Sequence, residues 1–357
     1  MAHTGELGGA ELALWTYLRH LPPHWRTAAL LLAPGPLEAM LAELGIPVTV
    51  LPVVGRPSIP EAATLQRRLA GELRARAPDV ILATGLKPAT LCALPARAAR
   101  VKLVWHKVDL TYDRHLTPTL SRLCRAVIPI SAAVGESVPP ARRLPAVPPP
   151  VRLPESFRVS PSRPPATLGS LGRLVPYKGH HHVIEAAGLL RGEFPEIRVT
   201  IAGGAAREAP DYPERLRETA RALGLEDRVT FTGHVDRVEP VLEDLTMLVN
   251  ATYRDEKGVG LEGLGASVIE AGWAGLPVVA TRGGGIGEGL LDGVSGLLVP
   301  PGRPELLAGA VRRYLADPEA AGAAGEAGAR HTRERFRPAE VSERLFGLLE
   351  EVAAGLR

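Results

Sequence analysis

Hydrophobic residues in this chain fall into short runs that alternate with longer stretches, where they recur every three or four positions. Short apolar runs of this kind are typical of strands buried in a parallel sheet. They predict strands in the first half at 27–32, 47–53, 79–83, 102–105 and 126–130. In the second half they predict strands at 166–171, 197–202, 228–231, 246–250, 277–281 and 296–299. The longer stretches predict helices at 9–20, 61–76, 180–191, 213–223, 303–316 and 339–354.

Strands that alternate with helices indicate an α/β fold with right-handed crossovers, in which ligands bind beyond the carboxyl ends of the strands. A length of 357 residues suggests two domains, at roughly 150 residues for each. Prolines crowd the region 139–165, where neither a buried helix nor a central strand would tolerate them. We therefore expect two domains of similar size, joined there by an extended linker.

The first predicted helix follows Gly8-Gly9-Ala10-Glu11, a glycine turn of the kind that normally comes after a strand. The sequence has no room for such a strand before Gly8. Either a first strand is missing from the sequence given, or this domain is built differently.

Composition excludes several classes of protein. Apolar residues make up 45 % of the chain and charged residues 23 %, as in ordinary globular proteins and unlike disordered or fibrous ones. No apolar run is long enough to span a membrane, and the first residues lack the pattern of a secretory signal. Cys92 and Cys124 have no metal-binding or disulfide-framework spacing. These features predict a cytoplasmic protein with reduced thiols, and no motif indicates a nucleic-acid partner.

Charge is distributed unevenly. Residues 1–150 hold 17 basic and 10 acidic side chains, whereas residues 151–357 hold 25 and 29. A basic first half would suit peripheral contact with the anionic inner face of a membrane, but a compositional excess without function explains it equally well. The predicted helix 61–76 also has two interpretations, because its leucine face could touch a lipid surface or pack on the sheet of its own domain.

Two cations indicate an anion-binding site in the second domain. Arg173 and Lys178 lie between a predicted strand and the start of the next helix. A helix N-terminus attracts anions, Arg can bind phosphate oxygens in pairs, and Lys adds a point charge. The alternative is two surface cations in a loop. The adjacent His180-His181-His182 point in different directions on a helix, so we expect them to be solvated at its start rather than to bind one metal.

Two glycine-bearing turns follow later strands. Glu262 and Glu270 flank the start of a helix, and Gly263 and Gly265 between them would let a ligand approach the backbone. The alternative is an ordinary glycine turn with two solvated carboxylates. A second turn, Gly283-Gly284-Gly285, follows the strand at 277–281.

In this order and spacing, the segments resemble the retaining glycosyltransferases of family 4 (glycosyl transferases group 1), which have the GT-B fold. The resemblance covers residues 165–300 through GRL-x3-KG, AGG, VTFTG, EGLG-x4-EA, GLPVVAT, GG-x2-E and DG-x2-GLLV. The sequence departs from the family at Gly287, where proline is usual. The resemblance implies two Rossmann-like domains that face each other across a cleft: 1–150 on the acceptor side, 151–337 for the nucleotide sugar, and a helix within 338–357 that crosses back.

The resemblance also implies roles for individual residues. It assigns the diphosphate to Arg173 and Lys178, the ribose to Glu270, and the donor sugar to Glu262 and to His106 of the first domain. Backbone near the donor would come from Gly8, Gly9, Gly263, Leu264, Gly265 and Ala266.

The implied reaction is transfer of a hexose from a nucleotide-diphosphate sugar to an acceptor hydroxyl, with retention and without a metal or other cofactor. Fixed cations would stabilise the leaving diphosphate. The sequence does not distinguish double displacement from attack on the same face, nor does it identify the base, sugar or acceptor. Three alternatives stay open: an epimerase acting on nucleotide sugars, a non-catalytic nucleotide-sugar-binding partner, and a dinucleotide-dependent oxidoreductase, although the last lacks its Gly-x-Gly-x-x-Gly turn.

Overall fold

The computed structural model describes residues 1–2, 8–53, 59–110, 113, 115–160, 165–255 and 260–356, without the side chains of residues 59 and 60. The chain forms two compact units. Unit 1 comprises Met1–Arg152 and Phe336–Arg357, and unit 2 comprises Leu153–Arg335. All eleven strands predicted from the sequence are present, most of them shorter at one or both ends than the apolar runs.

The parallel strands of unit 1 fall into two sheets. One pairs β1 (Ala29–Leu31) with β2 (Val48–Val50). The other has the order β3-β4-β5, formed by Val80–Thr84, Lys102–Lys107 and Ala126–Pro129. Residues Met1 and Ala2 hydrogen-bond to both sheets. Ala2 forms an isolated parallel bridge with Leu31.

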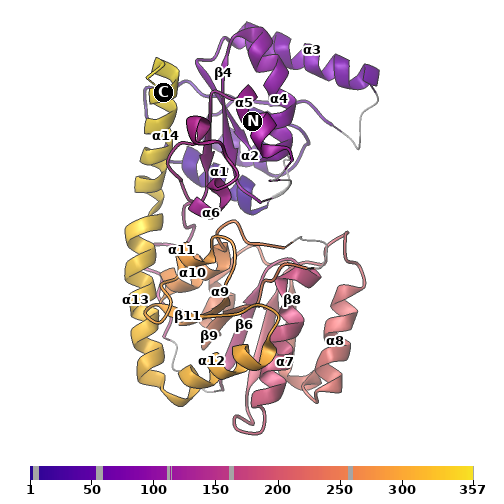
Figure 1. Ribbon diagram of the computed structural model, residues 1–357, viewed down its shortest axis with the longest axis vertical. Coiled ribbons are helices and arrows are strands. Elements are labelled where there is room, and N and C mark those ends of the chain that lie inside the picture. The colour runs from indigo at the N-terminus through magenta and orange to yellow at the C-terminus, as the bar shows by residue number, and fades with distance from the viewer. Residues whose placement is uncertain are drawn as a thin grey trace. The chain divides into compact units, whose positions relative to one another are not determined.

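Helices cover these strands on both faces (Figure 1). They are α1 (Gly9–Leu18), α2 (Leu37–Glu43), α3 (Ile59–Arg76), α4 (Leu86–Ala99), α5 (Thr117–Leu123), α6 (Ala132–Gly135) and α14 (Pro338–Ala354). The apolar face of α14 packs against α1 and the β4–β5 surface. Leu69 and Leu73 of α3 are buried, and α3 packs on α4. The leucine face of this helix therefore packs inside the unit.

The prolyl segment that we expected to be a linker is extended, but its first part belongs to unit 1. The N–H groups of Leu144 and Val147 donate to the carbonyls of Val127 and Pro129 on β5, at 2.9 Å each. A short 3-10 turn, Pro140–Arg142, precedes this pairing. Prolines are tolerated because the non-proline residues between them supply the donors. Residues 161–164 of the segment lie outside the described part of the chain.

Unit 2 is built on a six-stranded parallel sheet of order β11-β10-β9-β6-β7-β8. In chain order these strands are β6 (Thr167–Leu171), β7 (Arg198–Ala202), β8 (Val229–Gly233), β9 (Met247–Asn250), β10 (Val278–Thr281) and β11 (Gly296–Val299). The chain moves from β6 toward β8 in one direction, and from β9 toward β11 in the other. The order reverses between β6 and β9, which are direct neighbours.

The helices of unit 2 lie on opposite faces of its sheet because right-handed crossovers in opposite directions use opposite faces. One face carries α7 (His180–Leu190), α8 (Tyr212–Ala222) and α12 (Pro304–Ala316), of which α7 packs against both others (Figure 1). The other carries α10 (Ala266–Ala274). The remaining helical elements are α9 (Glu239–Glu243), α11 (Ile286–Gly289), α13 (Pro318–Phe336) and the 3-10 turns Pro176–Lys178 and Glu226–Arg228. Among the described residues, no helix is long and apolar enough to cross a membrane.

Candidate functional site

The candidate site of unit 2 lies where the strand order reverses. The loops that follow β6 and β9 leave the carboxyl ends of neighbouring strands and then run to opposite faces. Such a switch point is where open α/β sheets form a ligand-binding crevice. Two close backbone contacts bring the loops together. The Tyr253 N–H donates to the Tyr177 carbonyl at 2.9 Å, and a Cβ added to Gly179 would lie 2.1 Å from the Ala251 carbonyl oxygen.

The buried ring of His180 holds the β6 loop in place. His180 is 1 % exposed, with Nδ1 2.8 Å from Ser170 Oγ and Nε2 3.2 Å from the Arg173 carbonyl oxygen. A carbonyl can only accept, so Nε2 donates to it and Nδ1 accepts from the hydroxyl. Burial lowers the pKa of His180 to about 4, and the nearby charge of Lys178 acts in the same direction. The neutral ring thereby ties the end of β6 to the backbone of Arg173.

Arg173 reaches the surface beside this loop. Its guanidinium pairs with the carboxylate of Glu208 and donates to the Tyr177 hydroxyl at 2.9 Å. Both partners of the ion pair are more than half exposed, and such pairs are worth only about 0–1 kcal/mol. An anionic ligand could therefore displace Glu208 at little cost.

Lys178 and Glu262, which come from the two loops, form an ion pair. Their side chains are only 19 % and 16 % exposed, so water screens this pair less than the Arg173 pair. Thr252 Oγ1 also donates to Glu262 Oε1 at 3.3 Å. Lys178, which we predict to bind phosphate, and Glu262, which we predict to bind the sugar, are thus neighbours, and their opposite charges neutralise each other.

The glycine turn after β10 supports the backbone of Glu262. The Gly285 N–H donates to the Glu262 carbonyl at 3.0 Å. Gly284 has φ +55°, and a Cβ there would lie 2.0 Å from the same carbonyl oxygen. Only glycine fits such a close approach at a positive φ. The three-glycine turn therefore sets the position of the loop that carries Glu262.

Helix α10 begins at this edge of the sheet, so its first-turn amides face the switch point. Its N-cap, Gly265, has φ +80°. Leu264 and Gly265 are buried, Gly263 is half-buried and Ala266 is exposed. Glu270 lies half-buried within the helix, one turn beyond its start. Of the residues predicted in unit 2, Lys178 and Glu262 are in contact. The others, Arg173, Gly263, Leu264, Gly265, Ala266 and Glu270, lie in the loops after β6 and β9 or in the first turns of α10, and their binding roles stay predictions.

Gly8 and Gly9 open helix α1 in unit 1. The side chain of Glu11 folds back over them, and a Cβ on Gly8 would lie 2.9 Å from its Oε2. Burial raises the pKa of Glu11, while the backbone N–H groups of Glu11 and Gly8 offset part of this rise by hydrogen bonding to the carboxylate. The helix start therefore holds a carboxylate of its own chain, and contact of these glycines with a donor stays a prediction.

His106, to which the resemblance assigns catalytic contact with the donor sugar, is 2 % exposed near the end of β4. Its Nε2 lies 3.5 Å from the Val147 carbonyl oxygen, and Tyr17 packs edge-on against its ring. Burial lowers the pKa of His106 to about 4. To touch a sugar the ring would have to leave these contacts, so its proposed role stays a prediction.

The histidines at the start of α7 have three different sets of partners. His181 Nδ1 lies 2.7 Å from the Tyr212 hydroxyl, and His182 Nδ1 lies 2.9 Å from Glu185 Oε2. They are less solvated than we expected, because Tyr212 packs over the helix start and burial lowers the pKa of His181 to about 4. Across the part of the chain that the structure describes, no group of three His, Cys, Asp or Glu side chains could hold a metal ion.

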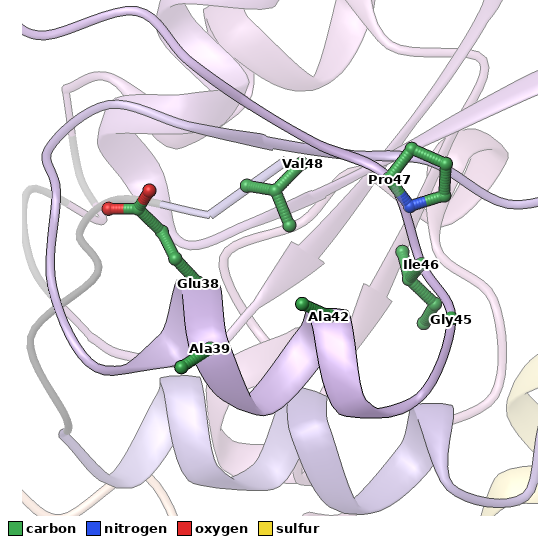
Figure 2. A pocket seen from close by; sticks show the side chains of 7 residues that line it. All are labelled: Glu38, Ala39, Ala42, Gly45, Ile46, Pro47 and Val48. Carbon is green, nitrogen blue, oxygen red and sulfur yellow. The ribbon is translucent and has the colours of Figure 1, made fainter.

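A hollow beside α2 carries no comparable chemistry. Figure 2 shows the residues that line it: Glu38, Ala39, Ala42, Gly45, Ile46, Pro47 and Val48. The one charged group among them is Glu38, whose Oε1 accepts from the Gly35 N–H at 3.0 Å and so caps the turn.

Three residues that support the site were not predicted from the sequence. Tyr177 lies inside the GRL-x3-KG segment, and Thr252 comes two residues after β9, so position could have indicated both. Glu208 follows β7 in a loop with no recognisable pattern.

A family model described as "Glycosyl transferases group 1" matches residues 154–331, which is nearly all of unit 2. The chain is 37 % identical over 186 residues to the GDP-mannose-dependent alpha-(1-6)-phosphatidylinositol monomannoside mannosyltransferase of Mycolicibacterium smegmatis, covering 50 % of this chain and 47 % of that protein. It is 35 % identical over 152 residues to the D-inositol 3-phosphate glycosyltransferase of Corynebacterium urealyticum, covering 42 % and 35 %. The chain thus spans less than half the length of these relatives.

Solved structures match both units together. The structure of Anabaena HepE in complex with UDP-glucose has a TM-score of 0.83 at 23 % identity, covering 98 % of this chain and 99 % of that one. The apo form of the lipopolysaccharide outer core galactosyltransferase WaaB has a TM-score of 0.76 at 18 % identity, with coverage of 98 % and 99 %. At such identities the likeness shows the fold alone, and it confirms the predicted GT-B fold.

Proposed function

Because residues 154–331 belong to the glycosyl transferases group 1 family, we propose that this protein transfers a sugar from a nucleotide-diphosphate sugar to an acceptor hydroxyl. One observation carries the proposal: Lys178 and Glu262 meet at the switch point of the unit 2 sheet. The ammonium suits the diphosphate of a donor, and the adjacent carboxylate suits the hydroxyls of its sugar.

The proposed chemistry follows from charge. When the bond between sugar and diphosphate breaks, negative charge grows on the leaving phosphate and positive charge grows on the anomeric carbon. Lys178, Arg173 and the first-turn amides of α10 would stabilise the leaving group. Glu262, released from Lys178, would face the sugar. We include retention of configuration and independence from metal in the proposal.

Similar proteins indicate which sugar donors to test. The name of the relative from M. smegmatis specifies GDP-mannose, and the HepE structure contains UDP-glucose. These are the first two donors to test. The acceptor, a location in the cytoplasm and contact of the basic unit with a membrane stay predictions.

The proposal is tested by incubating the full chain with GDP-mannose or UDP-glucose and measuring release of the nucleoside diphosphate. We expect release with one of them, and at least tenfold slower release with Lys178→Ala, because a hydrogen bond to a charged group contributes about 1.5–3 kcal/mol. Arg198→Ala is the matched control, since Arg198 is an exposed cation at the opposite, amino end of β7.

Near-normal release by Lys178→Ala would exclude the diphosphate assignment. Release that needs no acceptor and yields an epimer would favour an epimerase. Binding without release, whatever alcohol is added, would indicate a non-catalytic protein. If transfer occurs, NMR of the anomeric proton of the product tests retention, and an unchanged rate in excess EDTA tests metal independence.

A further inference from the structure

A third residue, Thr252, contacts the ion pair of Lys178 and Glu262. It comes two residues after the end of β9 and is 4 % exposed. Its hydroxyl donates to Oε1 of Glu262 at 3.3 Å, and the Lys178 ammonium donates to the same oxygen. Among the described residues, no group donates to Oε2 of Glu262, and that oxygen is open to solvent. One oxygen of the carboxylate is therefore held by two donors, while the other can accept from a ligand.

The backbone of Thr252 is tied to the ends of two paired strands. Its N–H donates to Asn250 Oδ1 at 3.2 Å, and its carbonyl accepts from the Thr281 hydroxyl. Asn250 is the last residue of β9 and Thr281 is the last residue of β10, and both are buried. Because threonine is β-branched, its side chain also has few rotamers. The Thr252 hydroxyl is therefore held in position without help from Lys178.

Lys178, by contrast, reaches Glu262 through a long and flexible side chain, whose ammonium can change partners. In the proposed function this ammonium binds the diphosphate of the donor. A diphosphate carries more negative charge than a single carboxylate, so it would draw the ammonium away from Oε1. Without the Thr252 hydroxyl, no described residue would then hold the carboxylate of Glu262, which could turn to other rotamers.

We propose that Thr252 is a positioning residue for Glu262. When Lys178 turns to the diphosphate, the Thr252 hydroxyl keeps its hydrogen bond to Oε1 and so limits rotation of the carboxylate. Oε2 then accepts a hydrogen bond from a hydroxyl of the donor sugar. Thr252 thus supports transfer of the sugar and leaves phosphate binding to Lys178. The inference rests on the proposed function, which gives Lys178 the diphosphate and Glu262 the sugar.

Thr252→Val tests the inference, because valine keeps the shape of threonine but cannot donate a hydrogen bond. We expect this variant to release nucleoside diphosphate from saturating donor about tenfold more slowly than the parent chain, as for loss of one hydrogen bond to a charged group. Thr252→Ser, which restores the hydroxyl, should recover turnover to within about threefold of the parent. Both variants should bind the nucleoside diphosphate alone within about twofold of the parent by titration calorimetry.

Thr332→Val is the matched control. Thr332 is a fully buried threonine of unit 2, and its hydroxyl donates to the Gly328 carbonyl within its own helix, α13, at 2.8 Å. We expect this variant to keep the turnover of the parent chain. Unchanged turnover in Thr252→Val would overturn the proposal. Nucleoside diphosphate binding that weakens in proportion to turnover would also overturn it, since Thr252 would then support the phosphate site.

A double-mutant cycle with Glu262→Ala shows whether Thr252 acts through Glu262. If it does, adding Thr252→Val to the Glu262→Ala chain should change turnover by less than about twofold. If Thr252→Val causes the same loss of turnover in the Glu262→Ala chain as in the parent chain, the proposal is wrong.

A second cycle needs no donor. In the Lys178→Ala chain, the Thr252 hydroxyl is the one donor to Oε1 that remains among the described residues. Urea unfolding of this chain with Thr252→Val, with Glu262→Ala and with both should show that the joint loss of stability is smaller than the sum of the single losses. Additive losses would contradict the contact on which the proposal depends. If the parent chain releases no nucleotide from either donor, the proposed function fails, whereas non-additive losses in this cycle would still support the contact.

Discussion

Lys178 and Glu262 are 84 residues apart in sequence, yet their side chains form an ion pair at the point where the unit 2 sheet reverses its strand order. The pair joins the loop after β6 to the loop after β9. His180 holds the first loop through a hydrogen bond to its backbone, and the glycine turn after β10 supports the backbone of the second loop. This arrangement gives the protein a neutralised pair that a donor could separate.

Replacing Glu262 tests whether the pair competes with a ligand. Glu262→Gln keeps the shape of the side chain but frees Lys178 from its counter-charge. We expect the nucleoside diphosphate to bind about three- to tenfold more tightly, since 1.4 kcal/mol corresponds to a factor of ten, while donor turnover falls because the sugar loses its carboxylate. Titration calorimetry and the release assay measure the two effects. Weaker nucleotide binding would instead make Glu262 part of the phosphate site.

Gly284 offers a test of the support behind Glu262. In Gly284→Ala the new methyl group would collide with the Glu262 carbonyl at a φ that alanine rarely adopts, at a cost of roughly 1–3 kcal/mol. We expect at least tenfold lower turnover and a lower melting temperature. Gly287→Ala is the control in the same segment, because a Cβ there meets nothing within 4 Å. Equal turnover for the two variants would show that the turn does not set the position of Glu262.

His180 should make stability depend on pH. Its pKa is about 4 in the folded protein, below the ordinary value of about 6.5, so the unfolded chain binds more protons between these values. The stabilisation is fully present above pH 6.5 and is lost as the pH falls toward 4. His180→Ala should lower the free energy of unfolding at pH 7 by about 1–3 kcal/mol, because Ser170 and the Arg173 carbonyl lose a partner.

Urea unfolding at pH 7 and pH 5 distinguishes the pH-dependent contribution of His180 to stability from a simple loss of packing. We expect the drop in stability between the two pH values to be smaller in His180→Ala than in the parent chain. It should not vanish, since burial also lowers the pKa of His106 and of His181 to about 4. An identical pH dependence in both chains would mean that His180 is not held neutral by the fold.

Much of the fold could be predicted because the spacing of apolar residues along the chain indicates which positions are buried. Every predicted strand is present, since an apolar run fits a strand buried on both faces whichever sheet it joins. Helix α4 was missed because Pro88 and Pro95 argue against a helix at 86–99. The structure offsets the second proline: the Leu91 carbonyl, four residues before Pro95, accepts from Gln66 Nε2 of α3 at 3.2 Å. That partner lies on another element and is invisible to local sequence.

Helix α13 was missed for a different reason. Its glycines suggest that a helix would be interrupted there. In the structure, a Cβ on Gly325 would lie 2.0 Å from the Gly275 carbonyl oxygen, so glycine allows α13 to approach the end of α10. In the site, residue types and spacing predicted that Lys178 and Glu262 would lie in loops at the carboxyl ends of strands, which the structure shows. They did not predict the pairing of Lys178 with Glu262, or the burial of His106, since both depend on contacts between distant segments.

The most direct test of the central claim is a thermal-shift panel with UDP, GDP, ADP and TDP at 1 mM each, on the parent chain, Lys178→Ala and Arg198→Ala. A ligand at a hundred times its Kd stabilises the folded state by about 2.7 kcal/mol, which raises the Tm by several degrees. We predict such a shift with one of the four bases, retained in Arg198→Ala and largely lost in Lys178→Ala. No shift with any nucleotide, or an undiminished shift in Lys178→Ala, would contradict a diphosphate site at Lys178.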